Sequence, residues 1–243
     1  MKKTAIITGA NKGIGLAMAL QLAEKGIDVI ITSRNLENGQ KALAHFAEKN
    51  LTAQLYTLDV ADENSIEQFV QQIKSTYPKI DMLINNAGVH LDGTWVGNTL
   101  NELSPSILYQ TFNTNFFGAV QLTQKLLPLL MQSDGARVVN ISSIMGSMQL
   151  HSQTGSDIWD VKPFAYDASK AAFNQFTIHL AHLFHKTAHS AVAVHPGWVK
   201  TDLGGEMAPL QTHEGALTGV MMALAADTRF NGKFMHMNQE IPW

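Results

Sequence analysis

The feature that most constrains the fold is an alternation, along the whole chain, of short apolar runs and longer segments of helical period. The apolar runs are rich in β-branched residues and occupy 4–8, 28–32, 53–58, 80–85, 136–142 and 191–195, with a weaker one at 233–237. The segments of helical period occupy 13–25, 36–49, 62–76, 104–131, 163–187 and 213–226. Because the runs are apolar almost throughout, they are typical of strands buried on both faces of a parallel sheet.

This alternation predicts a single α/β domain over residues 1–243. We expect one doubly wound, Rossmann-type parallel sheet of about seven strands, with helices on both faces. Ser104 followed by Pro105 is typical of a helix N-cap and first helical position, and predicts where the fourth helix begins. Ligands of such sheets bind at the carboxyl ends of the strands, so the candidate site residues should lie there.

Composition excludes several classes of function. A net charge of −3, spread evenly along the chain, argues against a surface for nucleic acid or anionic lipid. The absence of cysteine excludes disulfides, thiolate metal sites and a cysteine nucleophile. The apolar run near the N-terminus is too short for a signal peptide or a membrane span, so we expect a cytoplasmic protein.

The first predicted strand leads directly into a glycine-rich loop, TGANKGIG, at 8–15. Glycines let the backbone approach a pyrophosphate closely, and the N-terminus of the following helix directs free N–H groups at the anion. The glycine spacing differs from G-x-G-x-x-G. We expect this loop to bind a dinucleotide through Gly9, Asn11, Lys12, Gly13, Ile14 and Gly15.

The end of the second predicted strand indicates which dinucleotide binds. An NAD site usually places a carboxylate here for the ribose 2′-hydroxyl, but this chain has Ser33, Arg34 and Asn35, with no acid before Glu37. A guanidinium at this place suits a 2′-phosphate, and Lys12 could add a second positive charge. We therefore predict NADP(H) rather than NAD(H); the alternative is that Arg34 only covers a solvated loop.

Five motifs follow one another in the chain: TGANKGIG at 8–15, NNAG at 85–88, ISS at 141–143, YDASK at 166–170 and HPGWVKTD at 195–202. Any one of them alone would be weak evidence, but in this order they make the chain resemble the short-chain dehydrogenase/reductase family over essentially its whole length. Within that family the chain is most similar to NADPH-dependent carbonyl reductases.

The resemblance implies further cofactor contacts. Asp59 and Val60 would hold the adenine, although Asp59 could also act as an N-cap for the next helix. The remaining residues that the resemblance assigns to the cofactor are Asn86, Ala87, Gly88, Pro196, Gly197, Trp198, Val199 and Thr201, together with Tyr166 and Lys170.

Carbonyl reduction needs a proton donor beside the developing alkoxide, and the resemblance assigns this role to Tyr166. Lys170 lies one helical turn away, where its positive charge should lower the phenol pKa from about 10. By the same resemblance Ser143, the second serine of its pair, would bind the carbonyl oxygen. Asn115 would correspond to the helix asparagine that holds a water beside the lysine.

The stretch of 23 positions from Ser143 to Tyr166 is longer than in compact family members. It either covers the helix surface through which other members pair their subunits or forms one wall of the substrate pocket, and the oligomeric state stays open. The substrate contacts that we predict are Ser143, Met145, Met148, Trp159 and Trp95, the last from a loop at 90–101; the segment 203–210 is a further candidate wall.

We predict no metal site, because His179, His182, His185 and His189 are better explained as a solvated helix face. The sequence therefore predicts an NADPH-dependent short-chain reductase that acts on a small-molecule ketone or aldehyde. One alternative is an NAD(P)-dependent alcohol or hydroxysteroid dehydrogenase working oxidatively. A more remote one is a non-catalytic dinucleotide-sensing protein, because a fold alone does not fix function.

Overall fold

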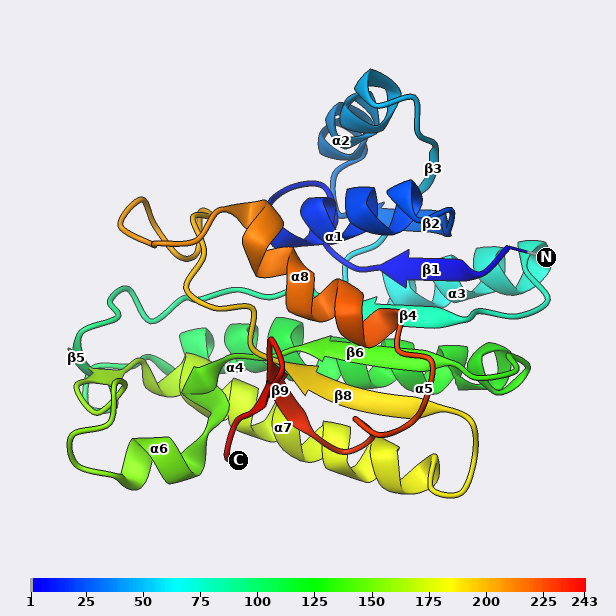
Figure 1. The fold of residues 1–243 in the computed structure, drawn as a ribbon. Helices are drawn as coiled ribbons and strands as arrows, with labels where there is room; N and C mark the ends of the chain where they lie inside the picture. Colours follow the sequence, from blue (N-terminus) through cyan, green and yellow to red (C-terminus); the bar gives the residue numbers. More distant parts are fainter. Residues whose placement is uncertain (1) are drawn as a thin grey trace.

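The computed structural model describes residues 2–243 and is built around one eight-stranded sheet (Figure 1). Seven strands run parallel, as the sequence predicts, and a short last strand adds an antiparallel edge that it did not predict. The strands in order across the sheet are β10 (Gln239–Glu240), β9 (Phe234–His236), β8 (Ser190–Val194), β6 (Arg137–Ile141), β4 (Met82–Asn85), β1 (Thr4–Ile7), β2 (Asp28–Ser33) and β3 (Ala53–Thr57).

Helices cover both faces of the sheet, as expected for a doubly wound fold. Alternate residues of β1 show the two layers: Ala5 and Ile7 face one core, whereas Ile6 faces the other. The first core is covered by α1 (Gly13–Glu24), α2 (Leu36–Glu48) and α8 (Thr212–Ala223), and the second by α3 (Glu63–Thr76), α5 (Gly118–Met131) and α7 (Phe164–Leu183).

The predicted helix at 104–131 is not continuous. Ser104 caps α4 (Pro105–Phe112) as predicted, by accepting a hydrogen bond from the Ile107 N–H at 3.3 Å. A π-helical turn, η1 (Asn113–Phe117), then separates α4 from α5. Turns of this width are frequent at functional sites. Here the turn carries a predicted site residue, Asn115, which is buried.

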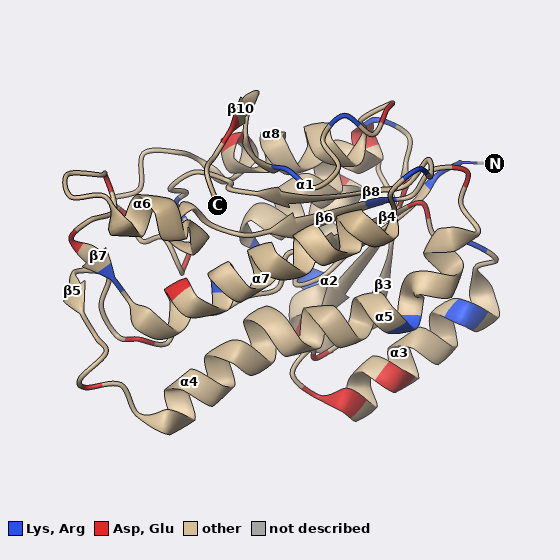
Figure 2. Cartoon of the chain, turned by 90° about the horizontal axis from the view of Figure 1, so that it is seen from below, with Lys and Arg blue, Asp and Glu red and all other residues tan. Residues whose placement is uncertain are grey.

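The long stretch between Ser143 and Tyr166 forms small elements at the carboxyl end of the sheet. They are η2 (Ile144–Gly146), α6 (Met148–Ser152) and β7 (Val161–Lys162), and β7 pairs with β5 (Gly97–Asn98). Large apolar side chains on the α4–α5–α7 layer, including Phe117, Ile178 and Leu183, remain exposed. Figure 2 shows that this layer carries few charges. The long stretch between Ser143 and Tyr166 therefore leaves these apolar side chains of the α4–α5–α7 layer uncovered.

The histidines do not form the single helix face expected of them. Helix α7 ends at Leu183, so His189 lies beyond it. His189 is buried, and its Nδ1 accepts a hydrogen bond from the Ala136 N–H at 2.9 Å. His189 therefore connects the residues that precede β6 and β8, and it does not face solvent.

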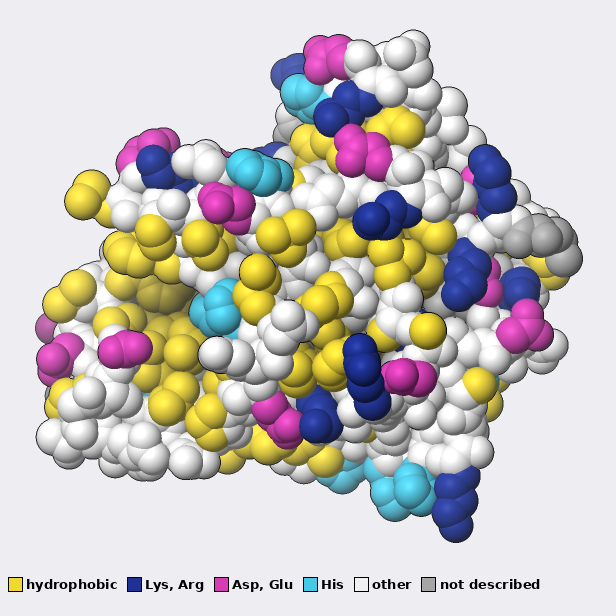
Figure 3. Space-filling view, viewed as in Figure 1, with side chains coloured by type: hydrophobic (Ala, Val, Ile, Leu, Met, Phe, Trp, Pro, Cys, Tyr) yellow, Lys and Arg dark blue, Asp and Glu magenta, His cyan; other side chains and the backbone are white. Residues whose placement is uncertain are grey.

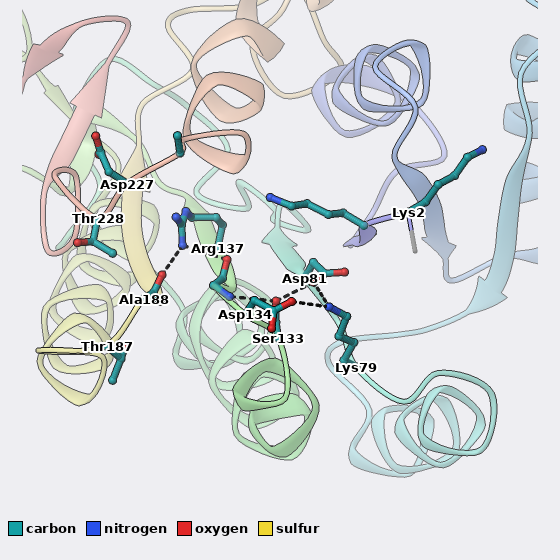
Figure 4. Close-up of a pocket in the computed structure, with 13 residues that line it drawn as sticks. Lys2, Lys79, Asp81, Ser133, Asp134, Arg137, Thr187, Ala188, Asp227 and Thr228 are labelled. Carbon is teal, nitrogen blue, oxygen red and sulfur yellow. Dashed lines mark hydrogen bonds and ion pairs between the residues drawn. The ribbon is translucent and has the colours of Figure 1, made fainter.

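A cavity of about 430 Å³ opens at the amino-terminal edge of the sheet, away from the motifs (Figure 4). Its main cations already have partners. Lys79 contacts Asp81 and Asp134 at 3.4 and 3.2 Å, and Arg137 donates to four backbone carbonyls, among them that of Ala188 at 2.7 Å. This cavity therefore reflects how the strand starts are held together, and the candidate site lies at the opposite edge.

Candidate active site

The glycine loop between β1 and α1 has the backbone form that a phosphate cradle needs. Gly9 and Gly13 have φ values of 61° and 59°, which side chains disfavour. A Cβ on Gly15 would lie 2.5 Å from Asn86 Nδ2, so only glycine fits there. Helix α1 has no capping side chain and no acidic residue in its first turn. Its N-terminal N–H groups therefore suit an anion such as a pyrophosphate.

The end of β4 holds this loop in place. Asn86 Nδ2 donates to the carbonyls of Thr8 and Gly9 at 2.8 and 3.2 Å, and Thr8 Oγ1 accepts from the Asn86 and Ala87 N–H groups. The amide of Asn86 is thus used to shape the loop. The NNAG and TGANKGIG motifs, far apart in the chain, form one structural unit.

At the end of β2, Arg34 is exposed and makes no hydrogen bond or ion pair within residues 2–243. Its neighbours are occupied: Ser33 Oγ donates to the Asn35 carbonyl at 2.8 Å, and Asn35 caps α2. Lys12, which we expected to share a 2′-phosphate with Arg34, forms an ion pair with Asp202 instead. Arg34 is therefore the available cation beside the glycine loop.

Asp59 does not cap α3. Its Oδ1 accepts from the Ala61 N–H at 2.9 Å, which makes a local turn, and Asp62 is the residue that caps the helix. Val60 is buried beneath Gly118, where a Cβ would lie 1.9 Å from the Val60 carbonyl oxygen. Asp59 therefore shapes the turn that follows β3, and Val60 anchors that turn against Gly118.

Tyr166 and Lys170 share one face of α7 and are 6% and 4% exposed. Lys170 Nζ donates to the Ile141 carbonyl at 2.9 Å and lies 5.6 Å from the centroid of the Tyr166 ring. A Cβ on Gly88 would lie 3.5 Å from the same Nζ. The structure thus brings the ends of β4 and β6 together with the predicted Tyr–Lys pair.

The pKa of Tyr166 differs in direction from the prediction. Burial raises the pKa of Tyr166 above its ordinary value, and a hydrogen bond with Ser143 opposes this only in part. Burial also lowers the pKa of Lys170 to about 8. Lys170, whose ammonium bonds the Ile141 carbonyl, does not offset this effect of burial, so the net lowering that we predicted for the phenol pKa is wrong for this structure. The phenol accordingly holds its proton at neutral pH.

The adjacent serines have different surroundings. Ser142 Oγ donates to Asn174 Oδ1 at 2.6 Å within the core. Ser143 Oγ accepts from the Met145 N–H at 3.2 Å and also interacts with the phenol of Tyr166. Ser143 is therefore the serine that can reach a group bound beside Tyr166.

Asn115 is buried between Val89 and the helix that carries Tyr166. Its Oδ1 accepts from the Val89 N–H at 2.7 Å, and its Nδ2 donates to the Val89 carbonyl at 2.9 Å and to Ser169 Oγ at 3.0 Å. Ser169 Oγ in turn donates to the Tyr166 carbonyl at 2.7 Å. Asn115 thus links the chain after β4 to the backbone of the helix that carries Tyr166.

Apolar side chains surround the phenol. Met145 packs with Tyr166, and the Trp95 ring meets the Tyr166 ring edge to face with centroids 5.2 Å apart. The His90 ring stacks on Trp95 at 3.8 Å. Figure 3 shows a hollow with mostly apolar walls on the side of the molecule where β6 and β8 end.

Two of the predicted substrate contacts lie outside this cluster. Met148 is 67% exposed, and Trp159 is 37% exposed with Lys162 Nζ 5.1 Å from its ring.

Among the residues predicted for the nicotinamide side, Trp198 donates to the Gly204 carbonyl at 2.7 Å. Thr201 lies close to Gly13: a Cβ added to Gly13 would be 3.4 Å from Thr201 Cγ2.

Asp92, in the loop at 90–101, contacts the site although it belongs to none of the sequence motifs. Its carboxylate accepts hydrogen bonds from the backbone of Ala165 and Tyr166. These partners are 73 and 74 residues away, and no local pattern signals such a contact.

Comparison with known proteins decides the family. Residues 3–211 match the sequence profile described as short chain dehydrogenase. The chain belongs to this family. Its glycine loop lies after β1, and Ser143 and the Tyr166–Lys170 pair lie where β6 ends. No helix among residues 2–243 has the length and apolar character needed to span a bilayer.

Individual relatives of this short-chain dehydrogenase have varied names. It is 30% identical to (-)-isopiperitenone reductase of Mentha piperita, over 96% of each chain, and 34% identical to retinol dehydrogenase 12 of Mus musculus, over 96% of this chain and 77% of that one. Among solved structures, the NADPH-bound carbonyl reductase from chicken fatty liver aligns with a TM-score of 0.84 at 27% identity, covering 100% of this chain and 99% of that one. A putative short-chain dehydrogenase/reductase from Burkholderia multivorans with bound NADP aligns with a TM-score of 0.86 at 25% identity, covering all of both chains.

Proposed function

We propose that this protein is an NADPH-dependent reductase that converts a ketone or aldehyde to an alcohol. The observation that carries the proposal is the convergence of the Tyr166 phenol, the Ser143 hydroxyl and the Lys170 ammonium at the ends of β4 and β6. A proton donor, an oxygen-binding hydroxyl and a cation are the groups that carbonyl reduction requires.

The cofactor part of the proposal rests on the glycine loop and on Arg34. Gly9, Gly13 and Gly15 form a cradle that a Cβ would fill, and the start of α1 leaves N–H groups for a pyrophosphate. Arg34 is an exposed cation that makes no hydrogen bond or ion pair with the described residues 2–243, which suits a 2′-phosphate. NADP is also bound in the Burkholderia multivorans structure and NADPH in the chicken reductase. NADPH, when bound, supplies the hydride.

The protein's own residues manage the oxygen and the proton. Ser143 donates a hydrogen bond to the carbonyl oxygen and stabilises the negative charge that develops on it. Tyr166 then gives its proton to that oxygen, and its raised pKa ensures that the proton is present at neutral pH. The Lys170 ammonium, 5.6 Å from the ring centroid, stabilises the phenolate that remains. Asn115 holds the backbone of α7 through Ser169.

The test is a panel of ketones and aldehydes with NADPH and with NADH, followed by the loss of reduced-cofactor absorbance. We expect turnover with NADPH and a loss of at least about 10²-fold in kcat for Tyr166→Phe, because general acid catalysis contributes 10²–10⁴-fold. Tyr109→Phe is the matched control, since Tyr109 is exposed and lies on α4. Unchanged turnover by Tyr166→Phe would refute the mechanism.

Oxidation of an alcohol is the second candidate, because retinol dehydrogenase 12 and the (+)-neomenthol dehydrogenases are among the relatives. In that direction Tyr166 must first lose its proton in order to accept one from the alcohol. Because its pKa is raised, the phenol stays mostly protonated up to pH 10, and the rate should rise steadily with pH as the small ionised fraction grows. The same panel, run with alcohols and NADP⁺ from pH 7 to pH 10, distinguishes the two directions.

A further inference from the structure

Helix α7, which carries Tyr166 and Lys170, begins without a cap of its own. The first N–H groups of any helix lack partners within the helix and need acceptors from elsewhere. The residue at the N-cap position is Pro163, whose side chain makes no capping bond. The Asp167 N–H reaches the Pro163 carbonyl at 2.9 Å, which leaves the N–H groups of Phe164, Ala165 and Tyr166.

Two side chains of the distant loop at 90–101 accept all three of these N–H groups. Asp92 Oδ1 accepts from Ala165 at 2.9 Å, and Asp92 Oδ2 accepts from Tyr166 at 3.1 Å. Thr99 Oγ1 accepts from Phe164 at 2.9 Å and donates to Asp92 Oδ1 at 3.0 Å. A carboxylate at this place also faces the positive end of the helix dipole. The loop thus provides a complete cap for the first turn of α7.

The same loop brings aromatic rings to the phenol. Trp95 and His90 both contact the Tyr166 ring edge to face, at 5.2 and 5.6 Å between centroids. Gly93 and Gly97, on either side of Trp95, have φ values of 85°, and a Cβ on either would meet nothing within 4 Å. The loop is therefore held by its hydrogen bonds to α7, by the β5–β7 pair and by the ring contacts of Trp95 and His90.

We propose that Asp92, supported by Thr99, is a positioning residue that fixes Tyr166 and the Trp95 wall as one unit against Ser143. The proposal rests on the proposed function, in which Tyr166 is the proton donor. Losing the cap would leave three buried or half-buried N–H groups without acceptors at the turn that carries the phenol. Small misplacements of a reacting group are costly to turnover even when binding is kept.

The carboxyl group of Asp167 lies next to this cap in the sequence and in the structure. The neighbouring carboxyl of Asp167 faces His151 Nε2 at 3.3 Å, and Lys162 lies on the other side of that histidine. Burial, together with the charge of Asp92, raises the pKa of Asp167 to about 8. At neutral pH Asp167 therefore keeps its proton and adds no negative charge at the start of α7.

The first experiment compares Asp92→Ala and Asp92→Asn with Ser104→Ala, which removes the cap of α4. We expect Asp92→Ala to lower kcat by about 10- to 100-fold while the NADPH dissociation constant changes less than about twofold. Asn keeps one acceptor oxygen and should restore part of kcat. Ser104→Ala should lower the melting temperature without lowering kcat. Wild-type kcat in Asp92→Ala, with Tyr166→Phe inactive, would overturn the positioning role and leave the proposed function intact.

A second experiment does not depend on turnover. Amide hydrogen exchange of Ala165 and Tyr166 should accelerate at least about tenfold in Asp92→Asn. Exchange of Phe164 should accelerate similarly in Thr99→Val, and Thr99→Ser should restore its protection. If Asp92→Ala does not fold, these milder variants carry the kinetic comparison as well. Unchanged exchange in both variants would overturn the cap. Wild-type activity of Tyr166→Phe would instead refute the proposed function. The exchange result would still decide whether Asp92 and Thr99 cap α7.

Discussion

Replacing Arg34 by alanine should remove the preference for NADPH over NADH while leaving the fold unaffected. Arg34 has no partner among residues 2–243, so its removal breaks no internal bond, and the melting temperature should stay within about 1 °C of wild type. A hydrogen bond to a charged group contributes about 1.5–3 kcal/mol. Because Arg34 is exposed, we expect the lower part of this range, about 1.5–2 kcal/mol, or a roughly 10- to 30-fold fall in the NADPH-to-NADH ratio of kcat/KM.

The assay measures kcat/KM for both cofactors with one carbonyl substrate. Arg229→Ala is the control, because Arg229 is exposed and contacts Asp227 and Phe230 instead of the glycine loop. Raising the salt concentration should reduce the preference of the wild type and leave Arg34→Ala nearly unchanged, since screening acts only on the charge that is present. An unchanged cofactor ratio in Arg34→Ala, or an equal change in Arg229→Ala, would refute the assignment.

Three further outcomes test other parts of the site. Gly15→Ala places a Cβ 2.5 Å from Asn86 Nδ2 and 2.8 Å from the Gly9 carbonyl oxygen. We therefore expect about 1–3 kcal/mol of destabilisation and weaker NADPH binding. A wild-type melting temperature and a wild-type NADPH affinity would contradict the role of Gly15 in the phosphate cradle. The pKa of Asp167 is raised to about 8 in the folded chain, so its contribution to stability is present at low pH and is lost as the pH rises from about 4 to about 8. Asp167→Asn should therefore melt with a smaller drop between pH 5 and pH 8.5 than wild type, and an equal drop would count against the raised pKa. Asp202→Asn releases Lys12 from its ion pair, so NADPH should bind more tightly in titrations, and unchanged affinity would show that Lys12 does not reach the cofactor.

Much of this arrangement follows from local patterns. The runs that form β1, β2 and β6 are mostly apolar because both faces of these strands are covered. The chain order of strands and helices then predicts a doubly wound sheet. The cap of α4 at Ser104 was likewise predicted, because an N-cap is recognisable within four residues.

Features that depend on distant contacts could not be predicted. The cap of α7 comes from Asp92, more than 70 positions earlier in the chain, and nothing near Tyr166 indicates it. The pKa of Tyr166 was predicted in the wrong direction because spacing places Lys170 on the same face but does not reveal how deeply both are buried. Small elements such as α6 and β7 are too short to have a periodic signature.

The π-helical turn η1 determines the direction in which the side chain of Asn115 points. A regular α-helix advances about 100° per residue, so deleting one residue from this turn would rotate everything on one side of it by that angle. Asn115 would then face away from Val89 and Ser169 even though the helix itself became more regular. Efforts to stabilise the protein by making its helices more uniform should therefore leave 113–117 untouched, because here irregular winding aims the side chain.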